Sequence, residues 1–157
     1  MPTTPDVILP RLNLPDFSER LRLRNLDGAQ EIFDPVRQTW VALTPEEWVR
    51  QNMTLYISDR LNIPLQRFAV EAPITYNGLN KRCDTIIYDE HGDPLIIVEY
   101  KRPTARLTQK VFDQVAVYNL RLNVPYLIVS NGMTHLMCQV DAENKRYIFT
   151  DKLNYGN

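Results

Sequence analysis

The sequence is poor in cysteine and histidine, the residues on which disulfide-bonded and zinc-bound domains depend. Its 157 residues contain two of each. Cys83 and Cys138 both lie in apolar stretches, where we expect buried thiols and no disulfide framework. His91 and His135 have no further ligand residues at the spacing of a zinc site. The sequence therefore excludes a disulfide-rich scaffold and predicts no zinc centre.

Long hydrophobic runs are also lacking. No segment reaches the roughly 18 consecutive apolar residues of a membrane-spanning helix, and residues 1–10 lack the basic and apolar regions of a secretory signal. The Gly-x-x-x-x-Gly-Lys-Ser/Thr element of ATP-binding loops does not occur, so we expect no motor in these residues. We predict a cytoplasmic protein without membrane contact.

Neither sign of charge is in excess. Lys and Arg number 18 against 19 Asp and Glu, which gives a net charge of -1 at pH 7. Proteins with a large non-specific nucleic-acid footprint usually carry a basic excess, so the balance argues weakly against one. Hydrophobic residues make up 44% of the chain, enough for one buried core.

We expect a single domain over residues 1–157, with an N-terminal arm over 1–25 and a core over 31–150. The arm is rich in Pro and Arg, and it either covers the core or pairs with a neighbouring molecule. The periodicities predict a hairpin over 31–43, a helix over 44–61, strands over 68–76, 82–89 and 95–101, a helix over 108–122, and strands over 125–129, 135–140 and 146–150.

Charged residues lie near the start of the predicted strand 82–89 and at the end of the predicted strand 95–101. The turn-forming residues 90–94 connect the two strands, and a hairpin centred there places Asp84 roughly opposite Glu99. Because side chains alternate along a strand, Lys101 shares the face of Glu99, while Tyr100 points into the core. The three charged side chains are therefore predicted to meet.

Two carboxylates that face each other across a hairpin repel unless a cation lies between them. A divalent metal ion would meet that need at Asp84 and Glu99. The alternative is that these charges only cap the sheet and are solvated. The almost continuously apolar run 95–98 favours a site, because polar residues that end such buried strands commonly form one in α/β proteins.

The order of Asp84 and then Glu99-Tyr100-Lys101 resembles the PD-(D/E)xK nuclease signature, with Cys83 standing where the proline often is. Downstream, Gln114 and Tyr118 resemble the QxxxY element that accompanies this signature. Residues 44–51 resemble the first helix, and residues 126–132 the closing strand, of the N-terminal nuclease domain of type I restriction enzyme R subunits. The resemblance extends over residues 32–147.

The resemblance implies an α/β fold, with a restriction-endonuclease-like α/β/α core of a central mixed sheet flanked by helices. It implies an Mg-dependent DNA endonuclease, with Mn as a substitute. Asp84, Glu99 and the main chain of Tyr100 would hold the metal, and Lys101 would orient or deprotonate the attacking water. Gln114 and Tyr118 share a helix face and would contact Lys101 or a substrate phosphate; alternatively, Tyr118 is a half-buried core ring.

Glu47 is a further candidate metal ligand, by analogy with the first-helix acid of such nucleases. The alternative is a capping box, since Thr44 is placed as N-cap, Pro45 as the first helical residue and Glu47 three residues after the cap. Arg50 and Gln51 follow one turn later and would extend a polar face toward the site.

DNA is the partner that the resemblance implies. The basic residues around the signature are the predicted contacts, with a solvated basic loop as the alternative; they are Lys81, Arg82, Arg102, Arg106 and Lys110. A motor subunit, a specificity subunit or a second copy of the chain would complete an assembly. The alternative function is a catalytically silent nuclease-fold module that binds DNA or assembles with a partner subunit.

Overall fold

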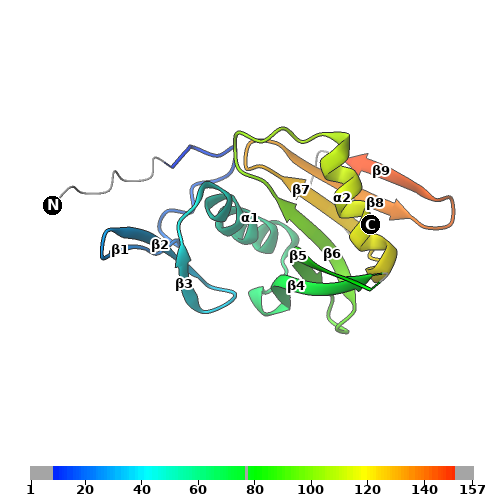
Figure 1. Cartoon of the computed structure of the whole chain (residues 1–157), viewed down its shortest axis with the longest axis horizontal. Coiled ribbons are helices and arrows are strands. Elements are labelled where there is room, and N and C mark those ends of the chain that lie inside the picture. Colours follow the sequence, from blue (N-terminus) through cyan, green and yellow to red (C-terminus); the bar gives the residue numbers. More distant parts are fainter. Residues whose placement is uncertain (1–8, 77, 151–157) are drawn as a thin grey trace.

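The residues that the structure describes form two β-sheets and two α-helices (Figure 1). The computed structural model describes residues 9–76 and 78–150. The smaller sheet contains β1 (Leu23–Leu26), β2 (Ala29–Asp34) and β3 (Thr39–Ala42). The larger sheet contains β4 (Phe68–Tyr76), β5 (Leu79–Tyr88), β6 (Pro94–Tyr100), β7 (Tyr126–Ser130), β8 (His135–Asp141) and β9 (Arg146–Thr150). The helices are α1 (Pro45–Leu61) and α2 (Gln109–Leu122), and the 3-10 turn η1 (Leu65–Arg67) joins α1 to β4.

Helix α1 begins and ends at residues that favour helix termini. The Oγ1 of Thr44 accepts a 3.0 Å hydrogen bond from the N–H of Glu47, and proline occupies the first turn. At the other end Asn62 adopts the left-handed conformation, with φ 55°, and its N–H donates to the carbonyl of Ser58. The helix therefore has the predicted bounds.

The six strands of the larger sheet lie in the order β4-β5-β6-β7-β8-β9. Strands β6 and β7 are parallel, because α2 carries the chain back across the sheet between them, and the other neighbours are antiparallel. Pro73 lies in β4, an edge strand, where its missing N–H removes no bond from the sheet interior. The predicted mixed sheet is confirmed.

One helix packs on each face of this sheet. Met53 of α1 and Val98 of β6 belong to one buried cluster, while Val115 of α2 and Ile97 of β6 belong to the other. Successive residues of β6 thus face opposite helices, as the pleat requires. This arrangement confirms the predicted α/β/α core. Within the described residues, neither helix has the length and apolar character needed to span a membrane.

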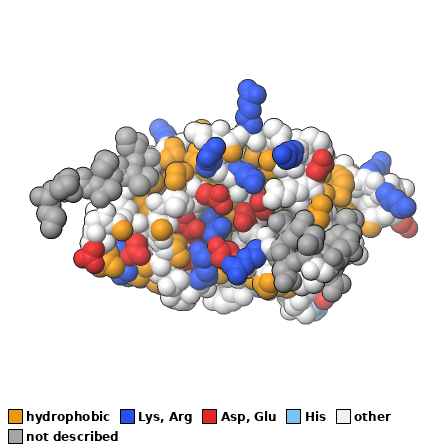
Figure 2. Space-filling model, in the orientation of Figure 1, with side chains coloured by type: hydrophobic (Ala, Val, Ile, Leu, Met, Phe, Trp, Pro, Cys, Tyr) orange, Lys and Arg blue, Asp and Glu red, His pale blue; other side chains and the backbone are white. Residues whose placement is uncertain are grey.

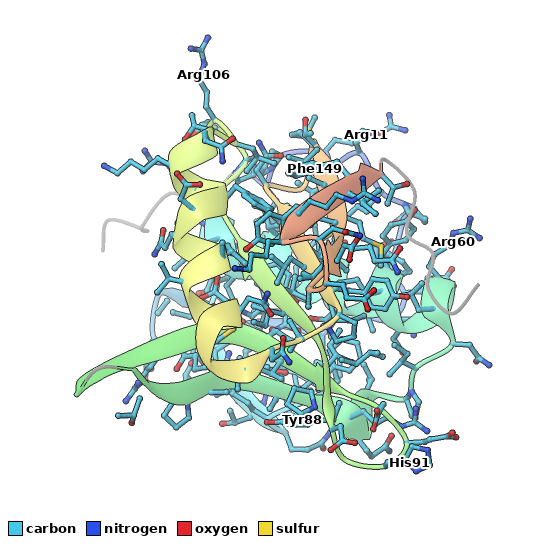
Figure 3. All side chains as sticks on the ribbon, turned by 90° about the vertical axis from the view of Figure 1, so that its right-hand side faces the viewer. Arg11, Arg60, Tyr88, His91, Arg106 and Phe149 are labelled. Carbon is cyan, nitrogen blue, oxygen red and sulfur yellow. The ribbon has the colours of Figure 1, made fainter. Side chains whose placement is uncertain are left out.

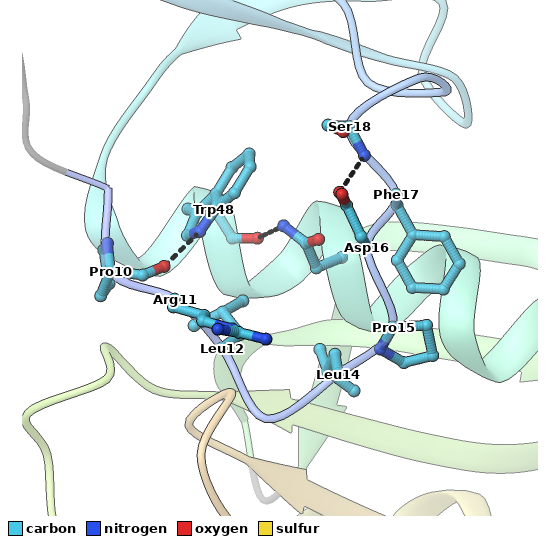
Figure 4. A pocket seen from close by; sticks show the side chains of 10 residues that line it. Pro10, Arg11, Leu12, Leu14, Pro15, Asp16, Phe17, Ser18 and Trp48 are labelled. Carbon is cyan, nitrogen blue, oxygen red and sulfur yellow. Dashed lines mark hydrogen bonds between the residues drawn. The ribbon is translucent and has the colours of Figure 1, made fainter.

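The N-terminal segment, residues 9–22, lies across α1 and covers the core. The N–H of Asn13 donates to the carbonyl of Gly132 at 2.9 Å, and the indole N–H of Trp48 donates to the carbonyl of Pro10 at 3.1 Å. Figure 4 shows this segment beside Trp48, enclosing a cavity of about 340 Å³. Covering the core was one of the two predicted roles of the arm.

Strand β1 was not predicted, although it lies largely within the predicted arm. Asp27 and Gly28 both have positive φ, 51° and 82°, and form the two-residue connection from β1 to β2. Asp-Gly between two strands is a strong hairpin signal, because both positions of such a turn favour left-handed backbone. The smaller sheet therefore has three strands, where the sequence analysis predicted two.

Candidate functional site

The paired stretch of β5 and β6 ends just before the residues of the predicted site. The last pair is Thr85 with Val98, and continuing the same register places Asp84 opposite Glu99. Beyond that pair, the N–H of Tyr100 donates to the Oδ2 of Asp84 at 2.9 Å. A side chain thus takes the place of a ladder partner at the point where the two strands separate.

On its other side, β5 is interrupted at the same residue. The ladder with β4 omits Glu71 and Asp84 but keeps one register on both sides of them. Glu71 has φ 53°, in the left-handed region that residues with a Cβ seldom adopt. Such backbone is common at functional sites. Asp84 is therefore released from both ladders, and its carboxylate lies against that of Glu99.

The structure brings together the three charged side chains that the sequence placed on one face. The Nζ of Lys101 lies 3.5 Å from the Oε1 of Glu99, and the carboxylate of Asp84 is close enough to Glu99 to raise its pKa. Tyr100 is 1% exposed and packs in the α1 cluster, as its alternation with Glu99 predicts. The predicted geometry of this hairpin is thus observed.

Glu99 is the buried member of the pair. Its burial, together with the neighbouring carboxylate of Asp84, raises the pKa of the Glu99 carboxyl well above its ordinary value, although Lys101 opposes the shift. Its Oε2 is buried and has no hydrogen-bond partner among the described residues. A buried carboxylate oxygen without a donor is costly unless a cation binds to it.

These features fit a hard divalent cation. Asp84 and Glu99 present carboxylate oxygens, and Mg²⁺ commonly binds one or two carboxylates while keeping several waters. Among the described residues, no group of three or more Asp, Glu, His or Cys side chains is arranged to hold a metal. Asp84 and Glu99 as metal ligands therefore stay a prediction, and any further ligands would have to come from the main chain or from water.

The Glu47 carboxylate is held by other side chains. Its Oε1 accepts from Arg37 at 3.1 Å and from Gln51 at 2.8 Å, and its Oε2 accepts from Arg50 at 2.9 Å. The predicted Thr44 cap is present, but the described bonds of the Glu47 side chain do not return to the N-cap. Glu47 thus belongs to an ion-pair network, and its role as a metal ligand stays a prediction.

Arg37 is the part of this network that the sequence analysis missed. It pairs with the buried carboxylate of Asp34 and lies 3.7 Å from Glu71. A lone arginine in a turn gives no sequence signal for such a role. Arg50, by contrast, belonged to the predicted polar face of α1, and its Nη2 lies 3.8 Å from the Oδ1 of Asp84. The network thus reaches the candidate site through Arg50.

An open hollow of about 490 Å³ lies beside this network. It is lined by Thr44, Pro45, Glu46, Glu47, Arg50, Glu71 and Arg102. Burial, together with the nearby negative charge of Asp84, raises the pKa of the Glu46 carboxyl. Figure 2 shows acidic and basic side chains interleaved on the middle of this face. The hollow thus adjoins the break at Asp84.

The predicted DNA-contacting residues lie in different surroundings. Arg102 lines the hollow, and the exposed Arg82 lies 3.8 Å from Glu71. Arg106 and Lys110 are exposed near the start of α2, and Figure 3 shows Arg106 projecting from the molecule. The side chain of Lys81 lies outside the described residues.

The predicted QxxxY pair lies on α2, which covers the same face of the sheet as Glu99. Gln114 is exposed, and no described hydrogen bond or ion pair joins it to Asp84, Glu99 or Lys101. The side chain of Tyr118 lies outside the described residues. The roles of both residues therefore stay predictions.

Comparison with known families identifies the chain. No curated protein matches it. The family model for the type I restriction enzyme R protein N terminus matches residues 45–153, which include both helices and all six strands of the larger sheet. This family falls within the PD-(D/E)xK superfamily. The chain therefore belongs to the type I restriction enzyme R protein N-terminus family.

Proposed function

We propose that this chain is an Mg-dependent DNA endonuclease domain that hydrolyses phosphodiester bonds. The observation that carries the proposal is the buried, unpartnered Oε2 of Glu99 beside Asp84, with the Lys101 ammonium 3.5 Å from the same carboxylate. Two acids and a lysine in this arrangement suit metal-assisted phosphoryl transfer to water.

Each residue has a role that follows from its position. Asp84 and Glu99 would hold Mg²⁺, or Mn²⁺ in its place, and the main chain of Tyr100 is a further candidate ligand because it adjoins Asp84. When bound, the ion supplies positive charge to the phosphoryl oxygens and acidifies water. The Lys101 ammonium is partly buried and lies 3.5 Å from Glu99, where it would orient the attacking water. In the neutral amine form, Lys101 would instead take the proton that this water loses.

The remaining predicted residues contribute to substrate binding in this proposal. Gln114 and Tyr118 of α2 contact Lys101 or a substrate phosphate. Arg82 and Arg102 contact the DNA backbone near the hollow; Lys81, Arg106 and Lys110 extend this surface. A motor or specificity subunit would deliver the DNA, and a second copy of the chain is a further candidate partner; that the family is one of restriction enzymes supports DNA as the substrate.

Cleavage of DNA by the parent chain and by Lys101→Ala tests the proposal. Supercoiled, linear and single-stranded DNA are each incubated with Mg²⁺, with Mn²⁺ and with EDTA. We expect metal-dependent cutting by the parent and a loss of at least about 100-fold in Lys101→Ala, with the fold retained. Lys145→Asn is the matched control, because Lys145 is exposed in the β8–β9 turn, has φ 52°, and asparagine tolerates that backbone.

Undiminished cutting by Lys101→Ala would contradict the role of Lys101. No cutting by either protein, with Mn²⁺ binding still detectable, would favour the second candidate function, a catalytically silent nuclease-fold module that binds DNA or assembles with a partner subunit. The observation on its side is that the described residues offer two carboxylates to a metal and no third.

A further inference from the structure

Arg50 of α1 contacts both Glu47 of the same helix and Asp84, which is a candidate metal ligand. Its side chain is 6% exposed. Its Nη1 donates to the Oε2 of Glu47 at 2.9 Å, and its Nη2 lies 3.8 Å from the Oδ1 of Asp84. The second distance is that of an ion pair and exceeds a hydrogen bond, so Asp84 is attracted by this guanidinium without being fastened to it.

The donors of Arg50 are far from used up. A guanidinium carries five N–H donors, and Arg50 makes one described hydrogen bond, with longer ion pairs of 3.8 Å to Glu71 and 4.0 Å to Glu46. Its Nε has no partner among the described residues. Arg37, in the same network, donates from Nε to Asp34 and from Nη2 to Glu47. Arg37 therefore fits a structural role, whereas Arg50 retains capacity for an anionic ligand.

The hollow is where such a ligand would lie. Arg50 lines it together with Arg102 and the N-cap residue Thr44, and the half-exposed carboxylates of Glu46 and Glu71 line it as well. Glu47 also lines it, but Arg37, Gln51 and Arg50 already bind its carboxylate. Arginine binds phosphate through paired N–H donors, and it does so more strongly where water is largely excluded. Because Glu46 and Glu71 oppose an anion in this hollow, a phosphate would bind there by the joint attraction of Arg50, Arg102 and a divalent ion at Asp84.

The same guanidinium affects metal binding in the opposite direction. Without metal, Asp84 and Glu99 are faced by two cations, Arg50 and Lys101. A divalent ion between the carboxylates would be repelled by Arg50 at this short range. A phosphate that binds against both the ion and Arg50 would be attracted by both.

We propose that Arg50 is the resident counter-ion of Asp84, which weakens divalent-ion binding by the free protein and contacts a backbone phosphate of the nucleic-acid substrate in the hollow. This inference rests on the proposed nuclease function. Its consequence is that metal and substrate bind together more readily than the metal binds alone, so that the charge balance at Asp84 restrains the site until DNA is present.

The test compares Arg50→Met with the parent chain in two binding experiments that need no cleavage. Calorimetry measures the Kd for Mn²⁺ of the free protein. Duplex DNA binding in EDTA is measured at several salt concentrations. We expect Arg50→Met to lower the Mn²⁺ Kd by about tenfold, to weaken DNA binding, and to reduce the slope of log K against log salt by about one. A purely structural arginine would not move that slope.

A second pair of variants tests whether misfolding, and not the loss of the guanidinium, causes the expected shifts. Removing Arg50 alone leaves Glu47 buried with one cation fewer, so Glu47→Gln/Arg50→Met removes both charges and is compared with Glu47→Gln. The same shifts are expected within this pair. Arg20→Met is the control for loss of any arginine, because Arg20 pairs with Asp59 at 2.6 Å away from the hollow. It should leave the Mn²⁺ Kd unchanged.

The outcomes separate the two proposals. A parent that neither binds Mn²⁺ nor cuts DNA contradicts the proposed function and this inference together. A parent that binds Mn²⁺ and cuts DNA, while the Arg50 variants keep the parental Mn²⁺ Kd and salt slope, overturns the role of Arg50 alone. Weaker Mn²⁺ binding in both comparisons also overturns it.

Discussion

Two charged clusters meet at Arg50 and differ in how fully they are satisfied. In the network of Asp34, Arg37 and Glu47, each carboxylate accepts from two or more donors. At the break in β5, by contrast, the Oε2 of Glu99 has no donor among the described residues, and its neighbour Asp84 is another acid. A buried network in which every polar atom is hydrogen-bonded makes the structure more rigid. A buried acceptor without a donor instead favours the binding of a ligand that supplies positive charge. The first cluster therefore supports the structure and the second suits chemistry.

The two clusters also differ in how much of each lies within the family match. The family match begins at residue 45, so it includes Glu47, Arg50 and the whole candidate site but excludes the strands and turn that carry Asp34 and Arg37. In this chain a segment outside the matched region supplies the partner of an acid inside it. The comparison teaches that Glu47 has to be interpreted together with residues that precede the family domain.

The largest expected effect separates chemistry from stability. Asp84→Asn should lower cleavage by about 1,000-fold and weaken Mn²⁺ binding, because it removes a candidate ligand. Without metal its stability should be unchanged or slightly raised, because repulsion with Glu99 is relieved. Cleavage assays, calorimetry and urea unfolding measure the three quantities. Asp113→Asn, on the exposed face of α2, is the control. Equal Mn²⁺ affinity in Asp84→Asn and the parent would remove Asp84 from the site.

The opposite behaviour is expected for the satisfied cluster. Glu47→Ala should lower the free energy of unfolding by about 3 kcal/mol, because it leaves Arg37 and Arg50 without their shared buried partner. Glu46→Ala is the control in the next position, since Glu46 is half-exposed and lies 4.0 Å from Arg50. Urea unfolding of both variants measures the difference. A loss for Glu47→Ala no greater than that for Glu46→Ala would show that the network is not structural.

The pH dependence of stability sharpens the comparison. The Glu99 pKa is raised from 4.5 to about 8 by burial and by Asp84, so the folded state holds a proton that the unfolded state releases. Without metal, the free energy of unfolding should therefore fall as the pH rises from about 4.5 to about 8.

Urea unfolding in EDTA between pH 5 and 9 measures this fall. Glu99→Gln should flatten the curve, and added Mg²⁺ should do the same in the parent, because a bound cation favours the ionised carboxylate. A parental fall that persists unchanged in Glu99→Gln would assign the pH dependence to other groups.

The smallest expected effect concerns the backbone between the two clusters. Glu71 has φ 53°, and its carboxylate is half-exposed and 3.7–3.8 Å from Arg37 and Arg50. Ion pairs of that kind contribute little. Glu71→Gly should therefore be more stable than Glu71→Ala by about 1 kcal/mol, because glycine adopts this backbone without strain. Equal stabilities in thermal unfolding would show that the left-handed backbone at Glu71 is not strained.

Much of the fold could be predicted from the sequence because its signals are local. The capping residues of α1 fix its ends, and the turn-forming residues between β5 and β6 predict their hairpin. The pairing shifts by one residue between Ile87 and Tyr88, and the register beyond that shift leads to Asp84 opposite Glu99. Alternation along β6 then puts Lys101 beside Glu99. The Asp27-Gly28 turn carries an equally local signal, so β1 was predictable and was missed.

The partners of Glu47 could not be predicted in the same way. In the sequence, the capping pattern at Thr44 explains why Glu47 stands at its position. In the structure, the Glu47 carboxylate accepts hydrogen bonds from Arg37, ten residues earlier, and from Arg50 and Gln51 on its own helix. A buried carboxylate is bound by whichever donors the packing brings near it, and sequence distance does not restrict that choice.

The sequence by itself determined the elements, the alternation within them and hence the face that carries Glu99 and Lys101, because hydrogen-bonding periods of helix and strand depend on neighbouring residues. Only the tertiary structure decided the rest. In the folded chain, Asp84 is not paired in the β4–β5 ladder, and the Oε2 of Glu99 has no donor among the described residues. Arg50 lies between Glu47 and Asp84. Those features depend on burial and on charges from distant segments, and so they exist only once the helices and sheets have packed together.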